Sequence, residues 1–517
     1  MRSSFVVAIC LCFACSSKKS ADDHAAPETG APPTAPAKPV VKKPVPKTPL
    51  PTLAADPGGA TGKPVWTAGF GGLGIDAPRG IAVDDAGNSY VAGYFEGEID
   101  FGGAIGKRKS AGGSDAFVVK LDATGKVAWA QTFGAKRDDA ANAIAVHGDT
   151  VVVVGNFLDE LKLGDYDKKA RTGSGSGDPA NMAQGSDYVF VAAFGTDGTP
   201  KWLWTLGGID SDGANAVASS PDGGWVIGGS FRDGIVDTGI ALKARGGTDA
   251  LLAKLAPSGD LEWIKQFGGT GDDQISHVAV DAQGSIYIQG VFKDVADFGG
   301  KPLKAANGSD TDVVLAKYDV NGDHVWSQRF GNPFNDVAGG VTVDPSGHVT
   351  MVGSFEHNGG PVSFGPGDSH DSAGESDIFV AHYTTDGKLE WAHTFGADRE
   401  DIGWGVAADS SGNIVMTGWF QRTVDFGKGP IESKGNKDVF ALKLDPKGAI
   451  VWVDTWGDHD HDQGRAVALD KTGASYVTGI YRFKLALVDP PLDSHRPATG
   501  VESMAPKPDA FVVKLAR

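Results

Sequence analysis

The chain has 517 residues, of which 74 are Gly, 28 are Pro and 3 are Cys, and its net charge is −18. The glycines have no period of three, which excludes collagen, and three cysteines cannot cross-link a chain of this length, which excludes a disulfide scaffold. An acidic surface repels phosphate, so we expect no nucleic-acid partner. A length above ~300 residues indicates several domains or an array of repeats.

The first fifteen residues have the pattern of an export signal. Arg2 gives a basic start, and the apolar run over residues 5–14 is too short to span a bilayer. The ending Ala14-Cys15 resembles the signal of a bacterial lipoprotein, although Cys12 stands where that pattern has Leu. The resemblance implies a signal peptide over 1–14, a lipid on Cys15 and export to the bacterial cell envelope. Ser16 after the cysteine favours the outer membrane. An ordinary cleaved signal peptide is the alternative.

A stretch rich in Pro, Ala and Lys follows over residues 15–63. Ten prolines stand between positions 27 and 57, and such a composition buries little apolar surface. We therefore expect a disordered tether between the lipidated cysteine and a globular part at 64–517. The acidic excess belongs to that globular part, because the tether is basic.

From residue 64 onward one pattern recurs seven times. A Trp is followed four residues later by an aromatic residue or Leu, and then by Gly. The seven tryptophans are Trp66, Trp129, Trp202, Trp263, Trp326, Trp391 and Trp452. Because they keep a fixed place in the repeat, we expect them to pack between units rather than to bind sugar.

An Asp also recurs in every unit, six residues after the aromatic residue or Leu. The seven are Asp76, Asp139, Asp212, Asp273, Asp336, Asp401 and Asp462. A ligand site would need such a residue in a few units and not in all seven. We therefore interpret this Asp as structural, with a side chain that accepts backbone N–H bonds where the chain crosses to the next unit.

Each unit is predicted to form four short strands, since β-branched and aromatic residues alternate with turns and no helical period occurs. In the first unit the strands cover 79–83, 89–95, 115–121 and 127–133. The last unit stops after its third strand, whereas the segment around Trp66 is a fourth strand with no unit before it. We predict an all-β, seven-bladed β-propeller of four-stranded blades, in which the N-terminal strand completes the last blade and closes the ring.

Several motifs of the first unit belong to a known repeat. They are Gly71-Gly72, Asp76, the runs 81–84 and 87–95, and 113–120. These residues resemble the SBBP repeat, the seven-bladed β-propeller repeat of bacterial secreted and surface proteins. The resemblance implies a propeller and an exported location, and it implies no particular reaction.

Almost all length variation falls between the second and third strands of each unit. These links cover 96–114, 158–186, 232–248, 293–311, 356–376, 421–437 and 482–508. In a four-stranded blade they lie on the same face as the links between units, so we expect one elaborated face and one plain face. Binding usually occurs where loops vary on a fixed scaffold. The links 158–186 and 482–508 are the longest and should project furthest.

The links between units are acidic, with 14 carboxylates against three basic residues. A negative rim attracts cations, so Ca²⁺ is a possible ligand, although no cofactor is required. Asp458, His459, Asp460 and His461 have metal-ligand side chains and are candidate metal ligands, with a solvated loop as the alternative. Histidines such as His382 fall in or near strands with no partner at ligand spacing.

No catalytic constellation emerges, because a G-x-S-x-G motif is missing and the cysteines all lie in positions 10–15. We predict an envelope-anchored lipoprotein whose non-enzymatic propeller binds or scaffolds a protein or glycan partner, with the lipid bilayer as the partner of its anchor. A cation-dependent envelope hydrolase or lyase that uses the acidic channel mouth is one alternative. A purely structural surface protein is another.

Overall fold

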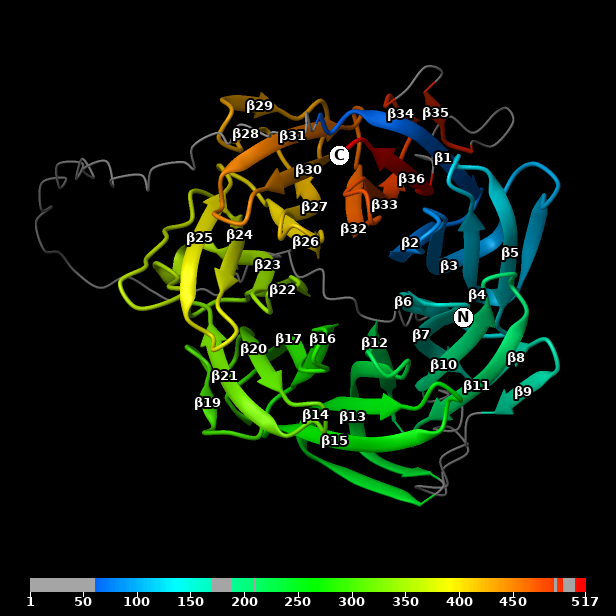
Figure 1. Ribbon diagram of the computed structural model, residues 1–517, viewed down its shortest axis with the longest axis horizontal. Coiled ribbons are helices and arrows are strands. Elements are labelled where there is room, and N and C mark those ends of the chain that lie inside the picture. Colours follow the sequence, from blue (N-terminus) through cyan, green and yellow to red (C-terminus); the bar gives the residue numbers. More distant parts are fainter. Residues whose placement is uncertain (1–60, 170–186, 209, 238, 488–490, 496–506) are drawn as a thin grey trace, which may run out of the picture. The chain divides into compact units, whose positions relative to one another are not determined.

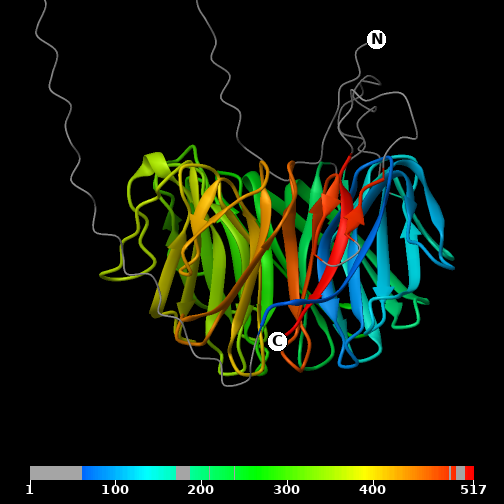
Figure 2. The same cartoon turned by 90° about the horizontal axis from the view of Figure 1, so that it is seen from above.

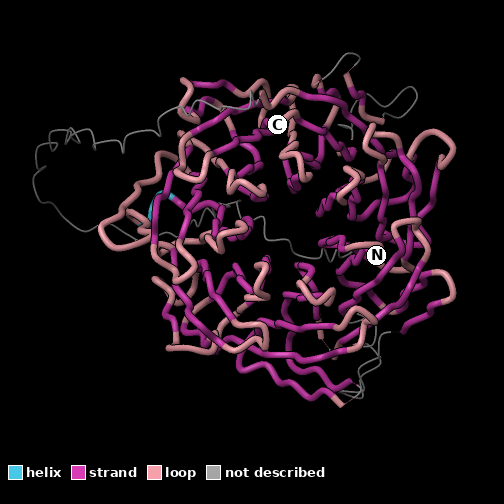
Figure 3. Tube along the Cα trace, in the orientation of Figure 1, coloured by secondary structure: helices cyan, strands magenta, loops and turns pink. Residues whose placement is uncertain are grey.

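Strands account for nearly all regular structure in this protein (Figure 3). The computed structural model describes residues 61–169, 187–208, 210–237, 239–487, 491–495 and 507–517. Within these residues the only helical turn is the 3₁₀ turn η1 (His357–Gly359). Over the same residues, no helix has the length and apolar character that crossing a membrane requires.

Each repeat unit begins at its recurring Asp or within two residues of it and contributes a set of main strands. Unit 1 has β2 (Asp76–Val83), β3 (Ser89–Asp100), β4 (Lys107–Leu121) and β5 (Val127–Phe133); unit 2 has β6 (Asp139–His147), β7 (Thr150–Leu158), β10 (Asp187–Gly195) and β11 (Pro200–Leu206); unit 3 has β12 (Asp212–Ser219), β13 (Trp225–Asp237), β14 (Ile240–Leu255) and β15 (Leu261–Gly269). Unit 4 has β16 (Gln274–Val280), β17 (Ile286–Phe292), β20 (Asp312–Tyr318) and β21 (His324–Phe330); unit 5 has β22 (Val337–Val343), β23 (Val349–Glu356), β24 (Ser376–Tyr383) and β25 (Leu389–Phe395); unit 6 has β26 (Ile402–Ala408), β27 (Ile414–Phe420), β30 (Asp438–Leu444) and β31 (Ile450–Trp456). Unit 7 has β32 (Gln463–Leu469), β33 (Ser475–Tyr481) and β36 (Asp509–Leu515), and it is completed by β1 (Pro64–Gly72).

The terminal strands meet as the repeat pattern requires. β1 runs antiparallel to β36, with partners from Pro64 opposite Leu515 to Phe70 opposite Ala510. Figures 1 and 2 show the first coloured strand lying beside the last. The prediction that the N-terminal strand of the repeat region joins the last unit is therefore confirmed.

Hydrogen bonding groups the main strands into six sheets rather than seven separate four-stranded ones, which corrects the expected blade boundaries. An eight-stranded sheet combines β32, β33, β36 and β1 with the four strands of unit 1. The junction is short: Gly71 and Gly72 of β1 pair with Asp100 and Ile99 of β3. The sheet of unit 3 is extended in the same way by strands from the variable link of unit 4, since Gly268 pairs with Asp297 of that link. Glycine allows this pairing, because a Cβ at Gly72 would lie 1.7 Å from the Glu98 carbonyl oxygen.

The links between second and third strands contain strand pairs in every unit except unit 5, among the described residues, which the sequence did not predict. In units 1 and 3 the main strands simply continue past a register shift, so 96–114 and 232–248 are largely strand. Other links form small separate pairs: β8 (Glu160–Leu163) with β9 (Tyr166–Lys169), β18 (Val295–Asp297) with β19 (Leu303–Lys304), β28 (Thr423–Asp425) with β29 (Pro430–Glu432), and β34 (Lys484–Leu485) with β35 (Leu492–Asp493).

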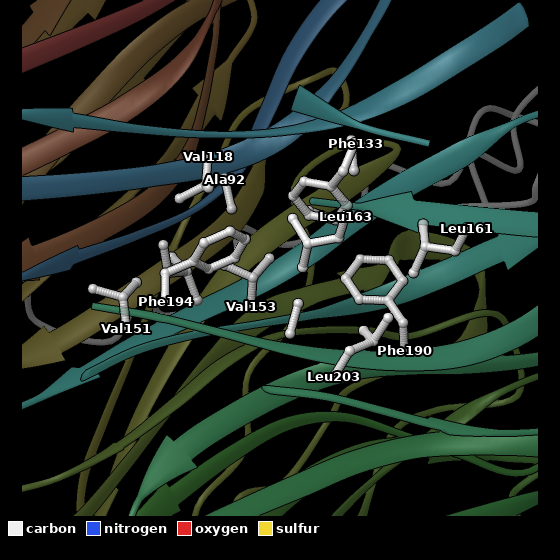
Figure 4. Close-up of a cluster of buried hydrophobic side chains, with 14 of the residues drawn as sticks. Ala92, Val118, Phe133, Val151, Val153, Leu161, Leu163, Phe190, Phe194 and Leu203 are labelled. Atoms are coloured by element: carbon white, nitrogen blue, oxygen red, sulfur yellow. The ribbon is translucent and has the colours of Figure 1, made fainter. Parts of the chain in front are cut away.

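The hydrophobic core lies between neighbouring units. Seven clusters of buried side chains occur, and each is shared by two consecutive units, the last by units 7 and 1. In Figure 4, Ala92, Val118 and Phe133 of unit 1 lie along one side of the cluster, and Val151, Val153, Phe190 and Phe194 of unit 2 lie along the other. Such burial of alternate strand faces explains why a unit is unstable alone and why the units stack.

The first strand of every unit lies innermost. β2, β6, β12, β16, β22, β26 and β32 each contact the next one, and β32 contacts β2, so they form a closed cycle around the centre of the ring (Figure 1). On the outer side, each recurring Trp packs on a turn glycine of the following unit. The seven pairs are Trp66–Gly125, Trp129–Gly198, Trp202–Gly259, Trp263–Gly322, Trp326–Gly387, Trp391–Gly448 and Trp452–Gly62. Packing between units is thus confirmed for these tryptophans.

Several expectations fall on residues outside the described ranges. They concern the signal peptide over 1–14, Cys15 and nearly all of the tether at 15–63. Residues 170–186 and 496–506, which belong to the two longest links, are also outside them. Nothing in the described residues tests the boundary at residue 64.

Candidate functional site

The variable links and the links between units lie on one face. The recurring Asp336 donates its N–H to the Thr311 carbonyl, which ends a variable link. The equivalent bond occurs at Asp76, Asp273, Asp401 and Asp462. The expected elaborated face therefore exists, and the recurring Asp residues stand at its inner edge.

Each recurring Asp uses its carboxylate to shape the chain before it. One carboxylate oxygen accepts the backbone N–H of the residue four positions earlier, at 2.7–3.0 Å, in all seven units. In unit 2 the other oxygen of Asp139 accepts the Leu158 N–H at 3.3 Å, which ties the start of the variable link to the same side chain. All seven side chains are buried.

Burial changes the acidity of these groups. It raises the pKa of Asp139 to about 8, even though the Ala135 N–H bond opposes this, and the nearby Asp115 of unit 1 raises it further. Burial likewise raises the pKa of Asp76 to about 9, with Asp509 as the second cause. The same pairing of a recurring Asp with the first Asp of a neighbouring third strand occurs around the ring.

Asp139→Asn is expected to flatten the dependence of stability on pH. The folded protein keeps the Asp139 proton up to about pH 8, whereas the unfolded chain releases it near its ordinary pKa of about 4. The stability from this proton is therefore complete below pH ~4 and is lost as pH rises toward 8, by at most ~1.4 kcal/mol per pH unit. Melting temperatures from pH 5 to 8 measure this slope. Asp122→Asn, at an exposed turn, should leave the slope nearly as in wild type, and equal slopes in wild type and Asp139→Asn would contradict the prediction.

Several of the remaining acidic side chains at the rim form ion pairs that the sequence did not suggest. Asp272 lies 3.5 Å from Arg232 and 3.6 Å from Lys293, Asp398 pairs with Arg422, and Glu400 pairs with Lys437. The variable links supply these basic side chains, and a count over the links between units alone missed them. The rim is therefore largely charge-compensated, and no contact within the described part of the chain identifies a Ca²⁺ site.

The four candidate metal ligands after Trp456 do not converge. His459 Nδ1 lies 2.8 Å from its neighbour Asp458, and His461 Nδ1 lies 2.5 Å from its neighbour Asp460. The group of three that the described residues do bring together is elsewhere, at Asp344, His348 and His382, whose ligand atoms lie within 4.8 Å of one another.

A second set of seven positions distinguishes the units from one another. Three residues after each recurring Asp, the innermost strand has a β-bulge at its junction with the second strand. We call the residues there the bulge ring: Arg79, Asn142, Asn215, Ser276, Gly339, Trp404 and Arg465. A bulge redirects a side chain and is frequent beside functional sites. The backbone irregularity repeats seven times, but the residue type does not.

The bulge ring is richest in aromatic and basic groups across units 6, 7 and 1. Trp404 packs on Trp419 with ring centroids 5.4 Å apart, and the Arg465 guanidinium lies over both rings at 5.4 and 5.5 Å. Arg79 lies 4.9 Å over the Tyr94 ring. These contacts hold two cations and a half-buried indole in fixed positions.

Hydrogen bonds join three residues of the bulge ring, Arg79, Asn142 and Asn215, to the following unit. Arg79 donates to Asn142 Oδ1 at 2.7 Å, and Asn142 donates to the Ala214 carbonyl at 2.9 Å. Asn215 in turn donates to the Ile275 carbonyl at 3.0 Å. Aligning the seven units by their Asp would have shown that residue type varies at these positions. The sequence alone does not mark the bulge that sets them apart from other variable positions.

Comparisons with known proteins agree with the fold. The family model of the SBBP Beta-propeller repeat matches residues 65–94 and 262–291. An uncharacterized WD repeat-containing protein of Acanthamoeba polyphaga mimivirus is 21% identical over 81% of this chain and 36% of its own length. The regulatory protein FlaEY of Caulobacter vibrioides is 27% identical over 59% of this chain and 32% of its own. The chain thus spans about a third of the length of these relatives. Together with the ring of antiparallel sheets, these matches define a β-propeller repeat protein.

Solved structures with a similar arrangement have low sequence identity. The Pan2 WD40 domain of Neurospora crassa has a TM-score of 0.42 and 8% identity, covering 88% of this chain and 97% of that domain. Sqt1 from Chaetomium thermophilum has a TM-score of 0.39 and 12% identity, covering 89% of this chain and all of that one.

Proposed function

We propose that this protein is a non-enzymatic binding or scaffolding module, anchored in the bacterial cell envelope, whose β-propeller receives a protein partner at the bulge ring. In this proposal the propeller has seven blades, with β32–β33–β36–β1 and β2–β3–β4–β5 counted as separate blades. Cys15 carries the lipid, and residues up to about 63 form the tether that separates the propeller from the outer membrane.

The observation that carries the proposal is a backbone bulge that repeats in every innermost strand while the side chain at it changes. The recurring Asp never changes, and its carboxylate is used by backbone N–H groups. Three residues later the side chain differs in type in most units, on a backbone that stays the same. Variation on a rigid scaffold is typical of a recognition surface.

The side chains of the bulge ring favour a protein partner. Trp, Tyr and Arg are enriched where protein interfaces concentrate their binding energy. Trp404 and Arg465 are half-buried and held by their neighbours, so little side-chain entropy is lost on binding. A glycan partner would use the same indole and the same asparagines, and it is the alternative that the experiment separates.

A photo-crosslinking residue placed at position 404 tests the proposal in the native host. We expect it to trap one discrete protein, whereas the same residue at Gly148, in an exposed turn of the plain face, should trap none. Arg465→Ala should weaken binding of that partner by ~30-fold, the effect of losing an interface hot spot, with an unchanged melting temperature. An adduct that contains carbohydrate and no protein would favour the glycan alternative. Equal trapping at both positions, or at neither, would contradict the proposal.

The alternative of a cation-dependent hydrolase or lyase finds less support. It needs carboxylates free to bind a cation or move a proton near the channel mouth. The recurring carboxylates are buried and accept backbone bonds, and several remaining acids of the rim form ion pairs.

A further inference from the structure

Unit 5 carries a cluster of two histidines and two carboxylates that the proposed function does not use. Asp344 follows β22, His348 precedes β23, His382 lies in β24 and Glu390 lies in β25. His348 Nδ1 is 3.7 Å from Asp344 Oδ2 and 3.7 Å from Glu390 Oε2, and His382 Nε2 is 3.5 Å from the same Glu390 oxygen. The cluster lies at the turns of the plain face, away from the bulge ring.

Comparison with the other units shows that this cluster departs from the repeat. The position of His382 holds a Lys in five units: Lys120, Lys254, Lys317, Lys443 and Lys514. In unit 3, Lys254 pairs with Glu262, the counterpart of Glu390, and with Asp222, which stands two residues after the counterpart of Asp344. In unit 7, Lys514 lies 3.2 Å from Asp470, the counterpart of Asp344. Unit 5 alone has an imidazole where those units have an ammonium ion.

A charged His382 does not simply replace the lysine. The side chain is 1% exposed, and burial lowers its pKa to about 4, with repulsion from His348 as the second cause. A neutral imidazole supplies a lone pair rather than a positive charge. Asp344 and Glu390 therefore lie around imidazole nitrogens in unit 5, where units 3 and 7 have an ammonium group.

The geometry fits a shared ion better than direct hydrogen bonds. Separations of 3.5–3.7 Å are too long for an N–H···O bond between these groups. Ligands placed about 2.0–2.2 Å from a tetrahedral ion lie on the order of 3.3–3.6 Å from one another. His382 Nε2 is buried with no hydrogen-bond partner. Its Nδ1 lies 2.8 Å from Thr350 Oγ1, and an Nδ1–H donated to that oxygen leaves the Nε2 lone pair free for a metal.

We propose that Asp344, His348 and His382, whose ligand atoms all lie within 4.8 Å of one another, form a site for a divalent transition-metal ion of the zinc class, with the Glu390 carboxylate beside both histidines. Two imidazoles favour zinc over calcium, which takes oxygen ligands. Two carboxylates balance the charge of the ion. A structural site typically has four protein ligands, and Glu390 is the residue nearest to both histidines that could supply the fourth. The proposed site clamps the turn between β22 and β23 to the ends of β24 and β25, a task that the lysine ion pair performs in units 3 and 7.

Zinc binding to the full-length chain tests the proposal. The protein carries Cys10, Cys12 and Cys15 replaced by Ser and no histidine tag, so that thiols and tags do not compete. We expect one Zn²⁺ per chain by metal analysis after equilibrium dialysis, and a melting temperature that rises with zinc and falls back with chelator. Co²⁺ in the same site should show the visible absorption of a tetrahedral ion.

Two variants and one control make the result specific. His348→Ala changes a side chain that is 35% exposed, and His382→Lys restores the residue of the other units, so both should fold. Each should bind zinc at least ~10-fold more weakly, since even loss of a residue that merely supports a ligand costs that much. A variant with His459→Ala and His461→Ala should bind as wild type does. Equal zinc affinity of wild type and His382→Lys, or loss of binding in the His459/His461 variant, would overturn the proposal.

Discussion

Gly125→Ala is expected to lower the free energy of unfolding by ~2–5 kcal/mol. Gly125 has a φ of 86°, in the left-handed region, where a side chain costs ~1–2 kcal/mol. Its new Cβ would also lie 2.6 Å from the indole of Trp66, and overpacking of this kind typically costs ~1–3 kcal/mol. The indole cannot easily move, because its Nε1–H donates to the Ala123 carbonyl at 3.1 Å. Thermal or urea unfolding measures the loss.

Gly97→Ala separates the two causes of that loss. Gly97 has a φ of 70°, but a Cβ there would meet no atom within 4 Å. We therefore expect Gly97→Ala to cost only the backbone part, ~1–2 kcal/mol. If both variants lose the same free energy of unfolding, the contact between Trp66 and its turn glycine adds nothing to stability. That result would contradict the prediction.

A disulfide between the first and last strands is the change with the largest expected gain. Ala68 and Val512 are directly paired residues of β1 and β36, and such pairs have the Cα separation that a disulfide needs. Ala68→Cys with Val512→Cys, in a chain whose native cysteines are Ser, should form a disulfide and raise the stability by up to ~5 kcal/mol, because it closes a loop of more than 400 residues in the unfolded chain. The melting temperature should drop when the disulfide is reduced. Each single cysteine variant is the control and should not respond to reductant.

The repeat made the fold predictable from one sequence. The same Trp, Gly and Asp recur in seven units, so the strand boundaries of one unit could be checked against six others. The closing partner of β1 then followed, because only the last unit lacks a fourth strand of its own. The recurring Asp was interpreted through the same logic, and its carboxylate does accept a backbone N–H in every unit.

The departures from the repeat were harder to predict, because they depend on register and on links of different length. His382 seemed isolated in sequence, yet the pairing of β23 with β24 places it opposite Thr350, and the ends of β22 and β25 bring Asp344 and Glu390 to it. Arg232 and Arg422 neutralise rim acids from positions tens of residues away. In units 1 and 3 the hairpins of the variable links arise from strands that continue through a register shift, a feature that alternation of residue types does not mark.

Formation of the disulfide between Ala68→Cys and Val512→Cys in the native protein tests the closure of the ring most directly. Intact mass and free-thiol labelling of the folded, unreduced protein give the answer without knowledge of any ligand. Closure by β1 predicts nearly complete loss of both thiols, without dimer formation, and a melting temperature above that of wild type. Two thiols that remain free in the folded protein, or a cross-link found only between chains, would contradict the pairing of β1 with β36.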